Sequence, residues 1–372
     1  MFIIATFFFP VLLGFCLSVV FTFFTIKIAN KLKILDIPHD RHQHKIPTPL
    51  LGGIAVGSAF VLSTIFFIFI NQLPGEYINL KRITGILIGI IILMIGGFLD
   101  DKFNLKPKQQ IVFQILAALI VISFGVGVNY ITNPFHHGYY FRIDELKFGF
   151  FLFGMPFVIN VFADTFTFLW LLGTTYTTKV LDGVDGLVSG VSSIGFFIIG
   201  FLCLGSVVHQ PDTAIISFLI AGCYLGFLFF NFNPAKIFLG ESGSTIAGFL
   251  LGSLAIISGG KIAITLLILS VPIIDFIIVI ISRILSGKSP FVGDRRHLHY
   301  RLRSLGLNDR QIVFIIYGIT IFFGSIGLIT NSLLKFWAII SAFLFMIIGL
   351  FVVGYVRKRM KIESEKNDKI EF

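Results

Sequence analysis

The sequence predicts an all-α polytopic membrane protein, and two observations support this class. Of the 372 residues, 56% are hydrophobic and only 13% are charged, whereas soluble domains usually carry about 25% charged residues. Uncharged stretches also recur at roughly the 20 residues needed to cross a bilayer. We therefore expect one integral membrane domain over residues 1–356 and a charged cytoplasmic tail without regular structure over 357–372.

About eleven transmembrane helices are expected. Their ranges are 2–26, 50–70, 83–99, 111–128, 165–181, 187–208, 213–232, 242–260, 262–282, 311–330 and 336–356. The first range has no basic region before it, and Lys27, Lys31 and Lys33 follow it, so it does not have the pattern of a signal peptide. We therefore expect the N-terminus outside and the C-terminus in the cytoplasm.

The distribution of basic residues supports this orientation. Of the 29 Lys and Arg residues, 23 fall in segments assigned to the cytoplasm and 6 in segments assigned to the outside, as the positive-inside rule requires. The net charge of +10 therefore reflects topology and attraction to anionic lipids, and no nucleic-acid partner is expected. The three cysteines all fall in expected spans, so no disulfide framework is indicated.

The longest outside loop runs from residue 129 to 164 and contains the alternating stretch "YYFRIDELKFGFFLF". Alternation of apolar and polar residues is typical of a strand. We expect a short external β-hairpin around 138–153 and place the start of the next helix near Thr165.

Acidic residues near the span ends gather on the expected cytoplasmic side. "GGFLDDKFNLKPK" places Asp100 and Asp101 at the end of the third span, which alone is also typical of a solvated helix end. "KVLDGVDGLVSG" contains Asp182 and Asp185, which would share one face of a helix. Two Asp-Gly pairs in one turn favour a site over a simple cap. "FLGESGS" puts Glu241 at a helix start, where free N–H groups favour an anion.

Basic residues and histidines occur on the same side. In "DRRHLHYRLRSLGL" two histidines at alternate positions would point the same way in an extended loop, and with the arginines they suit a diphosphate. A zinc site is less expected, because no third soft ligand lies nearby. The candidate substrate-binding residues are His44, Lys45, Lys108, Lys179, Arg295, Arg296, His297 and His299. Carboxylates beside phosphate-binding groups indicate a divalent cation, Mg²⁺ or alternatively Mn²⁺.

In this order and between these spans, the loops resemble those of the polyprenyl-phosphate N-acetylhexosamine-1-phosphate transferases. These enzymes initiate O-antigen (lipopolysaccharide), teichoic acid and peptidoglycan lipid intermediates. The resemblance runs from "HKIPTPLLGG" to "DRRHLHYRLRSLGL" and includes "PIIDFIIVIISR". It implies Mg²⁺-dependent transfer of a sugar-1-phosphate, GlcNAc-1-phosphate being favoured, from a UDP-sugar to undecaprenyl phosphate with release of UMP. It also implies the bacterial cytoplasmic membrane, an active site on the cytoplasmic face, and a homodimer.

Carried over by residue, the resemblance implies two sets of acids. The candidate catalytic residues are Asp100, Asp101, Asp182 and Asp185, and the candidate metal ligands are Asp100, Asp185 and Glu241. The family usually has Asp at position 241 and Asn at position 179. We expect Glu241 still to bind the metal, and Lys179, one helical turn before Asp182, to reach a phosphate. Lys179 is equally typical of the basic end of a span.

Two other functions stay open at this point. One is a transporter or flippase of lipid-linked or anionic substrates, and the other is a catalytically altered relative that binds lipid phosphate without turnover. Transporters usually place binding charges near the bilayer midplane, whereas here nearly all candidate charges lie at one face and Asp275 is the only acid inside an expected span.

Overall fold

The structure is a computed structural model that describes residues 7–37, 46–135, 140–152, 155–206, 208–259, 261–287 and 297–368. Its helices are α1 (Phe9–Leu32), α2 (Gly52–Phe69), α3 (Leu80–Phe103), α4 (Pro107–Ser123), α5 (Val161–Leu181), α6 (Leu187–Leu204), α7 (Pro211–Asn231), α8 (Gly240–Ile257), α9 (Ile262–Ile268), α10 (Ser270–Leu285), α11 (Leu298–Arg303), α12 (Asp309–Ile329) and α13 (Ser332–Asp368). Its strands are β1 (Leu35–Asp36), β2 (Thr48–Pro49), β3 (Tyr130–Thr132), β4 (Tyr140–Arg142), β5 (Lys147–Leu152) and β6 (Met155–Asn160).

The expected class, a helical polytopic membrane protein, is confirmed. Within the described residues, eight helices are long and apolar enough to cross a membrane, namely α1, α2, α3, α6, α7, α8, α12 and α13. The pair α9 and α10, bent by 79°, would make a ninth span. A helix occupies each of the eleven expected ranges, but α4 has only 17 residues and α5, whose last two turns hold four threonines, is not among the eight. Apolarity located the helices better than it counted the spans.

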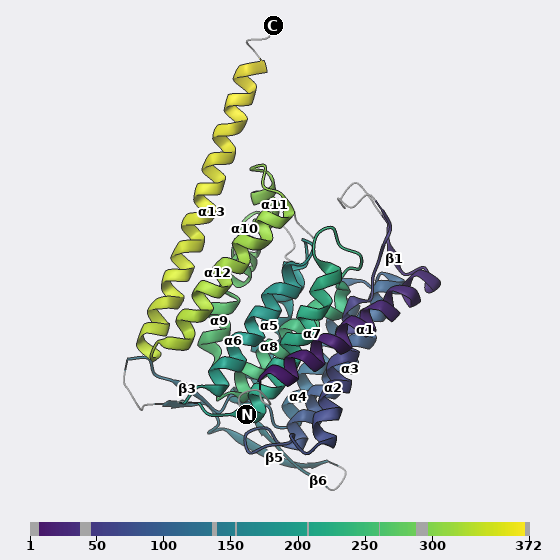
Figure 1. Ribbon diagram of the computed structural model, residues 1–372. Helices are drawn as coiled ribbons and strands as arrows, with labels where there is room; N and C mark the ends of the chain where they lie inside the picture. The colour runs from purple at the N-terminus through teal and green to yellow at the C-terminus, as the bar shows by residue number, and fades with distance from the viewer. Residues whose placement is uncertain are drawn as a thin grey trace.

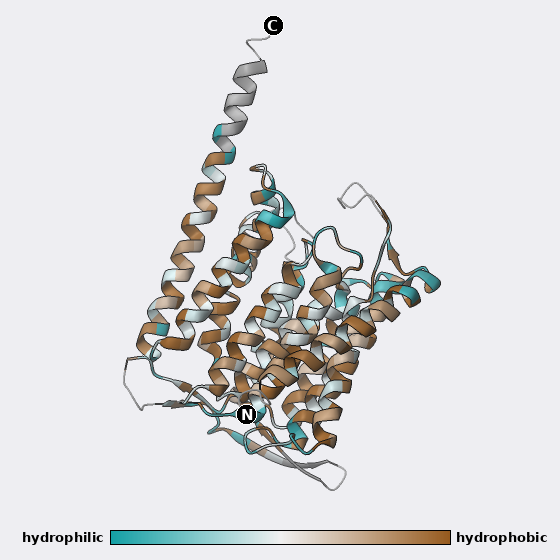
Figure 2. Ribbon diagram, in the orientation of Figure 1, coloured by the Kyte–Doolittle hydropathy of each residue, from teal (hydrophilic) through white to brown (hydrophobic). Residues whose placement is uncertain are grey.

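The helices form one bundle with distinct ends. In Figure 1, α5, α6, α7 and α8 lie in the middle, α1 to α4 on one side, and α9, α12 and α13 on the other. The β3 and β5–β6 region lies at one end of the bundle and α11 at the other. Figure 2 shows apolar residues along the helices and polar residues at the two ends. The most buried spans are α6, α7 and α8, so these three helices form the core of the bundle, and the site lies at the end where α8 begins.

The expected hairpin is present but its extent differs. β3 pairs with β4 and β5 pairs with β6, both antiparallel, so the region has two hairpins instead of one. The sequence placed the next helix near Thr165, whereas α5 begins at Val161. Asp164 Oδ2 accepts the N–H of Asn160 at 2.9 Å, which places this acid in the first turn of α5 as a cap.

The tail was expected to lack regular structure, and this prediction is wrong for most of it. α13 continues without interruption to Asp368. The segment "RKRMKIESEKND" consists mainly of Arg, Lys, Met and Glu, which are good helix formers. A helix already formed by the apolar half of α13 has its nucleation cost met, so these residues add to it more readily than they would form a new helix.

The start of α8 packs against α2 and α3 at positions that have no side chain. A Cβ atom at Gly97 would collide with the backbone of Ser242, and one at Gly53 would collide with the backbone of Gly243. The backbones therefore approach to contact, as small residues allow between membrane helices. This contact fixes the first turn of α8, with Glu241, relative to the end of α3, with Asp101.

We predict that Gly97→Ala lowers the thermal midpoint of the detergent-solubilised protein. The added methyl group overpacks the contact between α3 and α8, and overpacking typically costs about 1–3 kcal/mol of stability. Gly173→Ala is the matched control, since no atom lies within 4 Å of a Cβ built on Gly173 in α5 and Ala suits a helix interior better than Gly. Thermal unfolding of the two purified variants measures the difference. Equal midpoints would contradict the close approach of α3 and α8.

Candidate active site

The first part of the site is the contact between the end of α3 and the start of α8. The N–H of Glu241 lies 3.3 Å from Asp101 Oδ1, and Asp101 Oδ2 is buried without a hydrogen-bond partner among the described residues. Gly240 has φ +72°, and a Cβ there would lie against Asp101 Oδ2. A side chain at position 240 would therefore displace the carboxylate. Asp101 faces the positive end of the α8 dipole, which offsets part of the cost of burying this carboxylate beside Asp100 and Glu241.

A polar network joins this contact to two further helices. Lys179 Nζ, from the last turn of α5, lies 2.6 Å from Glu241 Oε1 and 2.7 Å from Gln110 Oε1. Gln110 Nε2 donates to Asp100 Oδ1 at 2.7 Å, and Gln114 Nε2 donates to Glu241 Oε1 at 3.2 Å. The carboxylates at the end of α3 and the start of α8 are thus linked through α4 and α5.

The Asp-Gly turn between α5 and α6, which contains Asp182 and Asp185, forms another side of the site. Asp182 follows the last residue of α5. The protein around Asp182 removes much of its solvent, and Glu241, Asp101 and Asp185 add negative charge nearby. Together they raise the pKa of Asp182 to about 8, although the residue still reaches solvent. The carboxylates from three separate loops are therefore close enough to act on one another, an arrangement that favours a bound cation.

Asp185 has a different environment from Asp182. Its Oδ2 accepts hydrogen bonds from Asn233 Nδ2 and from the N–H of Ala235, both at 3.1 Å. Asn231 supports the same turn, because its Oδ1 accepts the Gly186 N–H at 3.1 Å. Asp185 thus holds the loop that leads into α8 and contributes to the shape of the site.

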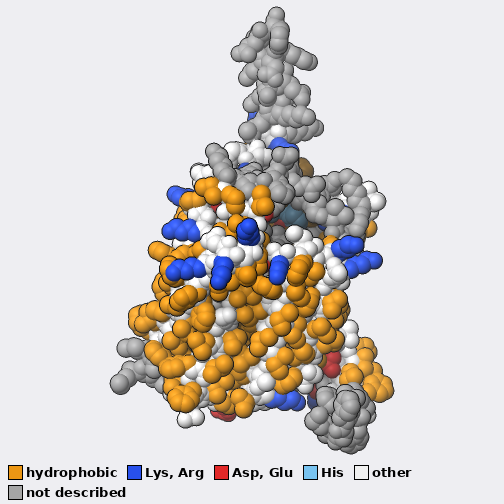
Figure 3. Space-filling view, turned by 90° about the vertical axis from the view of Figure 1, so that its right-hand side faces the viewer, with side chains coloured by type: hydrophobic (Ala, Val, Ile, Leu, Met, Phe, Trp, Pro, Cys, Tyr) orange, Lys and Arg blue, Asp and Glu red, His pale blue; other side chains and the backbone are white. Residues whose placement is uncertain are grey.

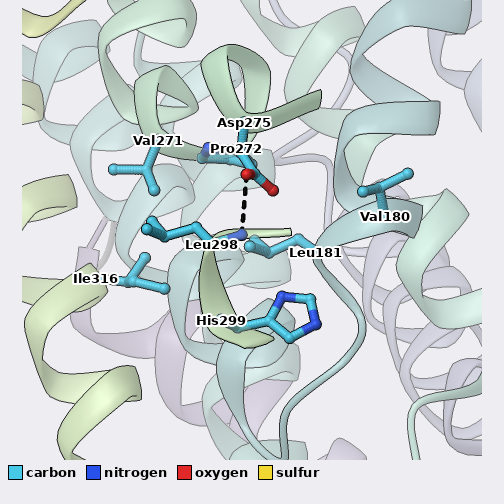
Figure 4. A pocket seen from close by; sticks show the side chains of 8 residues that line it. All are labelled: Val180, Leu181, Val271, Pro272, Asp275, Leu298, His299 and Ile316. Atoms are coloured by element: carbon cyan, nitrogen blue, oxygen red, sulfur yellow. Dashed lines mark hydrogen bonds between the residues drawn. The ribbon is translucent and has the colours of Figure 1, made fainter. Parts of the chain in front are cut away.

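The histidine segment is held by an acid from inside a span. Asp275 on α10 is 7% exposed. Its Oδ2 lies 2.8 Å from His297 Nδ1, and its Oδ1 accepts the Leu298 N–H at 2.9 Å, the bond drawn in Figure 4. The rings of His297 and His299 are nearly parallel, with an interplanar angle of 6°. Asp275 therefore fixes both the start of α11 and the ring orientation of His297.

His299 points from α11 toward the Asp-Gly turn. It is 4% exposed, and its Nε2 has no hydrogen-bond partner among the described residues. A Cβ at Gly183 would collide with this atom, so Gly183 leaves the space that the ring occupies beside Leu181 (Figure 4). Burial, with a smaller contribution from His297, lowers the pKa of His299 to about 4. The ring is therefore neutral at pH 7 and offers one nitrogen to the site.

The other candidate residues fall into two groups. Lys108 lies exposed in the first turn of α4. His44, Lys45, Arg295 and Arg296 lie outside the described residues. The sequence analysis missed Gln110 and Gln114. Their signal was available, because they are polar residues four positions apart on one face of an otherwise apolar helix.

The donor set fits magnesium. Within the described ranges, no three His, Cys, Asp or Glu side chains form a preassembled metal cluster. Magnesium usually takes only one or two carboxylates and completes its shell with water and substrate phosphates. Asp101 Oδ2 has no hydrogen-bond partner among the described residues, and the backbone of Glu241 contacts the same carboxylate, so hard oxygen donors suited to such a shell come from both helix ends.

We predict that His299 makes stability fall with acid. Its folded pKa of about 4 lies below the unfolded value near 6.5, so the unfolded chain binds more protons between these values. Stability is thus full above about pH 6.5 and is lost as the pH falls toward 4, by up to about 3 kcal/mol. Thermal midpoints at pH 7.5 and 4.5 should differ less for His299→Gln than for the parent. An equal difference in both proteins would contradict the buried neutral ring.

Comparison with known proteins identifies a matching family domain and several relatives. Residues 83–259, which include Asp101, Asp182 and Glu241, match the glycosyl transferase family 4 domain. The chain is 31% identical over 346 residues to the probable undecaprenyl-phosphate N-acetylglucosaminyl 1-phosphate transferase of Bacillus subtilis, covering 90% of this chain and 88% of that protein.

Two further relatives have related names. The undecaprenyl-phosphate alpha-N-acetylglucosaminyl 1-phosphate transferase of Escherichia coli is 28% identical over 360 residues, covering 93% of this chain and 89% of its own. The decaprenyl-phosphate N-acetylglucosaminephosphotransferase of Mycobacterium leprae is 29% identical over 317 residues, covering 78% and 75%. Because these matches extend over most of both chains, this chain belongs to glycosyl transferase family 4, the family of these prenyl-phosphate sugar-1-phosphate transferases.

Proposed function

We propose that this protein transfers GlcNAc-1-phosphate from UDP-GlcNAc to undecaprenyl phosphate and releases UMP. The observation that carries the proposal is the convergence of Asp101, Asp182 and Glu241 with His299 at one end of the bundle. A cluster of carboxylates beside a histidine suits a reaction between two phosphates and a divalent cation. The choice of a prenyl phosphate and GlcNAc as substrates follows the names of the relatives given above.

We place the reaction on the cytoplasmic face of the bacterial cytoplasmic membrane. The site lies at the end of the bundle where α11 and the ends of α3 and α5 meet, opposite the hairpins (Figure 1). Figure 3 shows Lys and Arg side chains in a band above the broad apolar belt, toward the same end. Because basic residues mark the cytoplasmic side, a cytosolic UDP-sugar and a lipid phosphate can both reach this end.

The chemistry needs alignment more than proton transfer. A lipid phosphate oxygen attacks the β-phosphorus of UDP-GlcNAc, forming a new P–O bond. The bond from that phosphorus to the bridging oxygen breaks, and UMP leaves with the electron pair. A phosphate monoester has its second pKa near 6 and is largely ionised at pH 7, so no general base is required. Magnesium, held by Asp101 and Glu241, would supply charge neutralisation for the diphosphate.

The chain's own side chains then bind and orient the substrates. The neutral His299 can hydrogen-bond the nucleotide or its diphosphate through Nε2. His297 presents its other nitrogen in an orientation set by Asp275. Arg295 and Arg296 stay predicted diphosphate ligands, because guanidinium groups suit phosphate oxygens.

We predict that the purified protein with UDP-GlcNAc, undecaprenyl phosphate and Mg²⁺ releases UMP in step with the lipid-linked product. Glu241→Gln should reduce this turnover to background, because a neutral amide is a poor ligand for a hard cation. Product is measured by nucleotide chromatography and lipid extraction. Intact UDP-GlcNAc with a folded parent protein would contradict the transferase and favour a transport or binding role. An enzyme carrying a sugar phosphate in the absence of lipid would contradict direct attack.

We predict that Asp275 is a positioning residue for His297. In Asp275→Asn the amide oxygen still accepts the Leu298 N–H, but the charge that fixes the His297 ring is lost. Removing a carboxylate that orients a histidine typically costs about 10- to 100-fold. The loss should appear mainly in kcat, with an unchanged protein level and thermal midpoint. Asp275→Glu should recover part of the rate. A variant with parental kcat would contradict this role.

A further inference from the structure

Lys179 and Glu241 form a lysine–carboxylate pair inside the candidate site. Their side chains are 22% and 13% exposed, and the Nζ–Oε1 distance is 2.6 Å. The pair joins the last turn of α5 to the first turn of α8. It therefore differs from a surface ion pair, since most of each side chain is removed from solvent.

The ammonium is held in place from two sides. Gln110 Oε1 lies 2.7 Å from Lys179 Nζ, and Gln110 is itself held by Asp100 and the Leu105 carbonyl. The Tyr176 ring lies 5.7 Å from Nζ, within the range of a cation–π contact. These contacts hold the ammonium beside Glu241 Oε1, so its charge contributes to the electrostatics of the site.

The oxygen that Lys179 contacts, Glu241 Oε1, is shared with a second donor. Glu241 Oε1 accepts from both Lys179 and Gln114. A magnesium ion needs carboxylate oxygens at about 2.0–2.1 Å and tolerates little distortion of its shell. A divalent ion on this oxygen would sit beside a fixed ammonium, and the two like charges would repel.

We propose that Lys179 is a tethered competitor for the divalent cation at Glu241. The ammonium neutralises the Glu241 carboxylate, and a divalent ion binds there by displacing it. The metal affinity of the site is therefore set by the tethered charge, and Gln110 retains the displaced ammonium near the substrate phosphates. This inference rests on the proposed function in taking the divalent ion of that reaction as the competitor.

A supporting role for Lys179 predicts the opposite change in metal affinity. If Lys179 served only to hold Glu241 in a ligating position, its removal would weaken metal binding. A competitor, once removed, leaves the metal to bind more tightly. The direction of the change in affinity therefore separates the two.

The test is Mn²⁺ binding to the purified full-length protein, followed by the electron paramagnetic resonance signal of free Mn²⁺ and without substrate or turnover. Lys179→Met keeps the side-chain stem and removes the charge, and we expect it to tighten Mn²⁺ binding about 10-fold. Lys31→Met, at an exposed lysine in the last turn of α1, should change the affinity less than twofold. Lys179→Gln gives a second uncharged variant if Lys179→Met does not fold.

The role of Glu241 is tested in the same titration. In a Glu241→Gln background, the gain from Lys179→Met should disappear, because the contested carboxylate is gone. Weaker or unchanged binding in both Lys179 variants, a gain that persists without Glu241, or no Mn²⁺ binding by the parent would overturn the inference. A parent protein that binds Mn²⁺ as expected but releases no UMP would instead overturn the proposed function.

Discussion

The contact between the end of α3 and the start of α8 is the constraint on which the rest of the site depends. It exists because Gly97 and Gly53 let the α8 backbone approach α3 and α2 without intervening side chains. That approach brings the N–H of Glu241 to Asp101. Each carboxylate alone would be a solvated helix end, and together they are an anionic site at the positive end of a buried helix.

The remaining elements balance and shape this concentration of charge. Lys179 supplies a positive charge from α5, and Gln110 and Gln114 supply donors from α4. On the other side, Asp275 holds the histidine segment over the Asp-Gly turn. The arrangement leaves unpartnered polar atoms, such as His299 Nε2, in a region that is otherwise closely packed. Unsatisfied buried groups are costly, so their presence fits a site that is completed by its substrates.

The sequence predicted the helical class and the loops that carry Asp101, Asp182 and Glu241, because apolar length and clustered acids are local signals. It did not predict the pairing of Asp275 with His297, which depends on the 79° bend between α9 and α10 and on where α11 docks. The contact between Lys179 and Glu241 was missed for a similar reason. Lys179 was expected to reach a phosphate or to mark the basic end of a span, and its contact with Glu241 depends on the tertiary approach of α5 and α8. Local patterns located the candidate residues, and the packing of the helices determines their partners.

The central claim is that one divalent ion binds between the ends of α3 and α8. The most direct measurement is the anomalous scattering of Mn²⁺ in crystals of the full-length protein soaked with Mn²⁺ and UDP-GlcNAc. Our account predicts one strong peak in contact with the carboxylates of Asp101 and Glu241. A peak at Asp185 without contact to Glu241, or no peak in crystals that contain bound nucleotide, would contradict it.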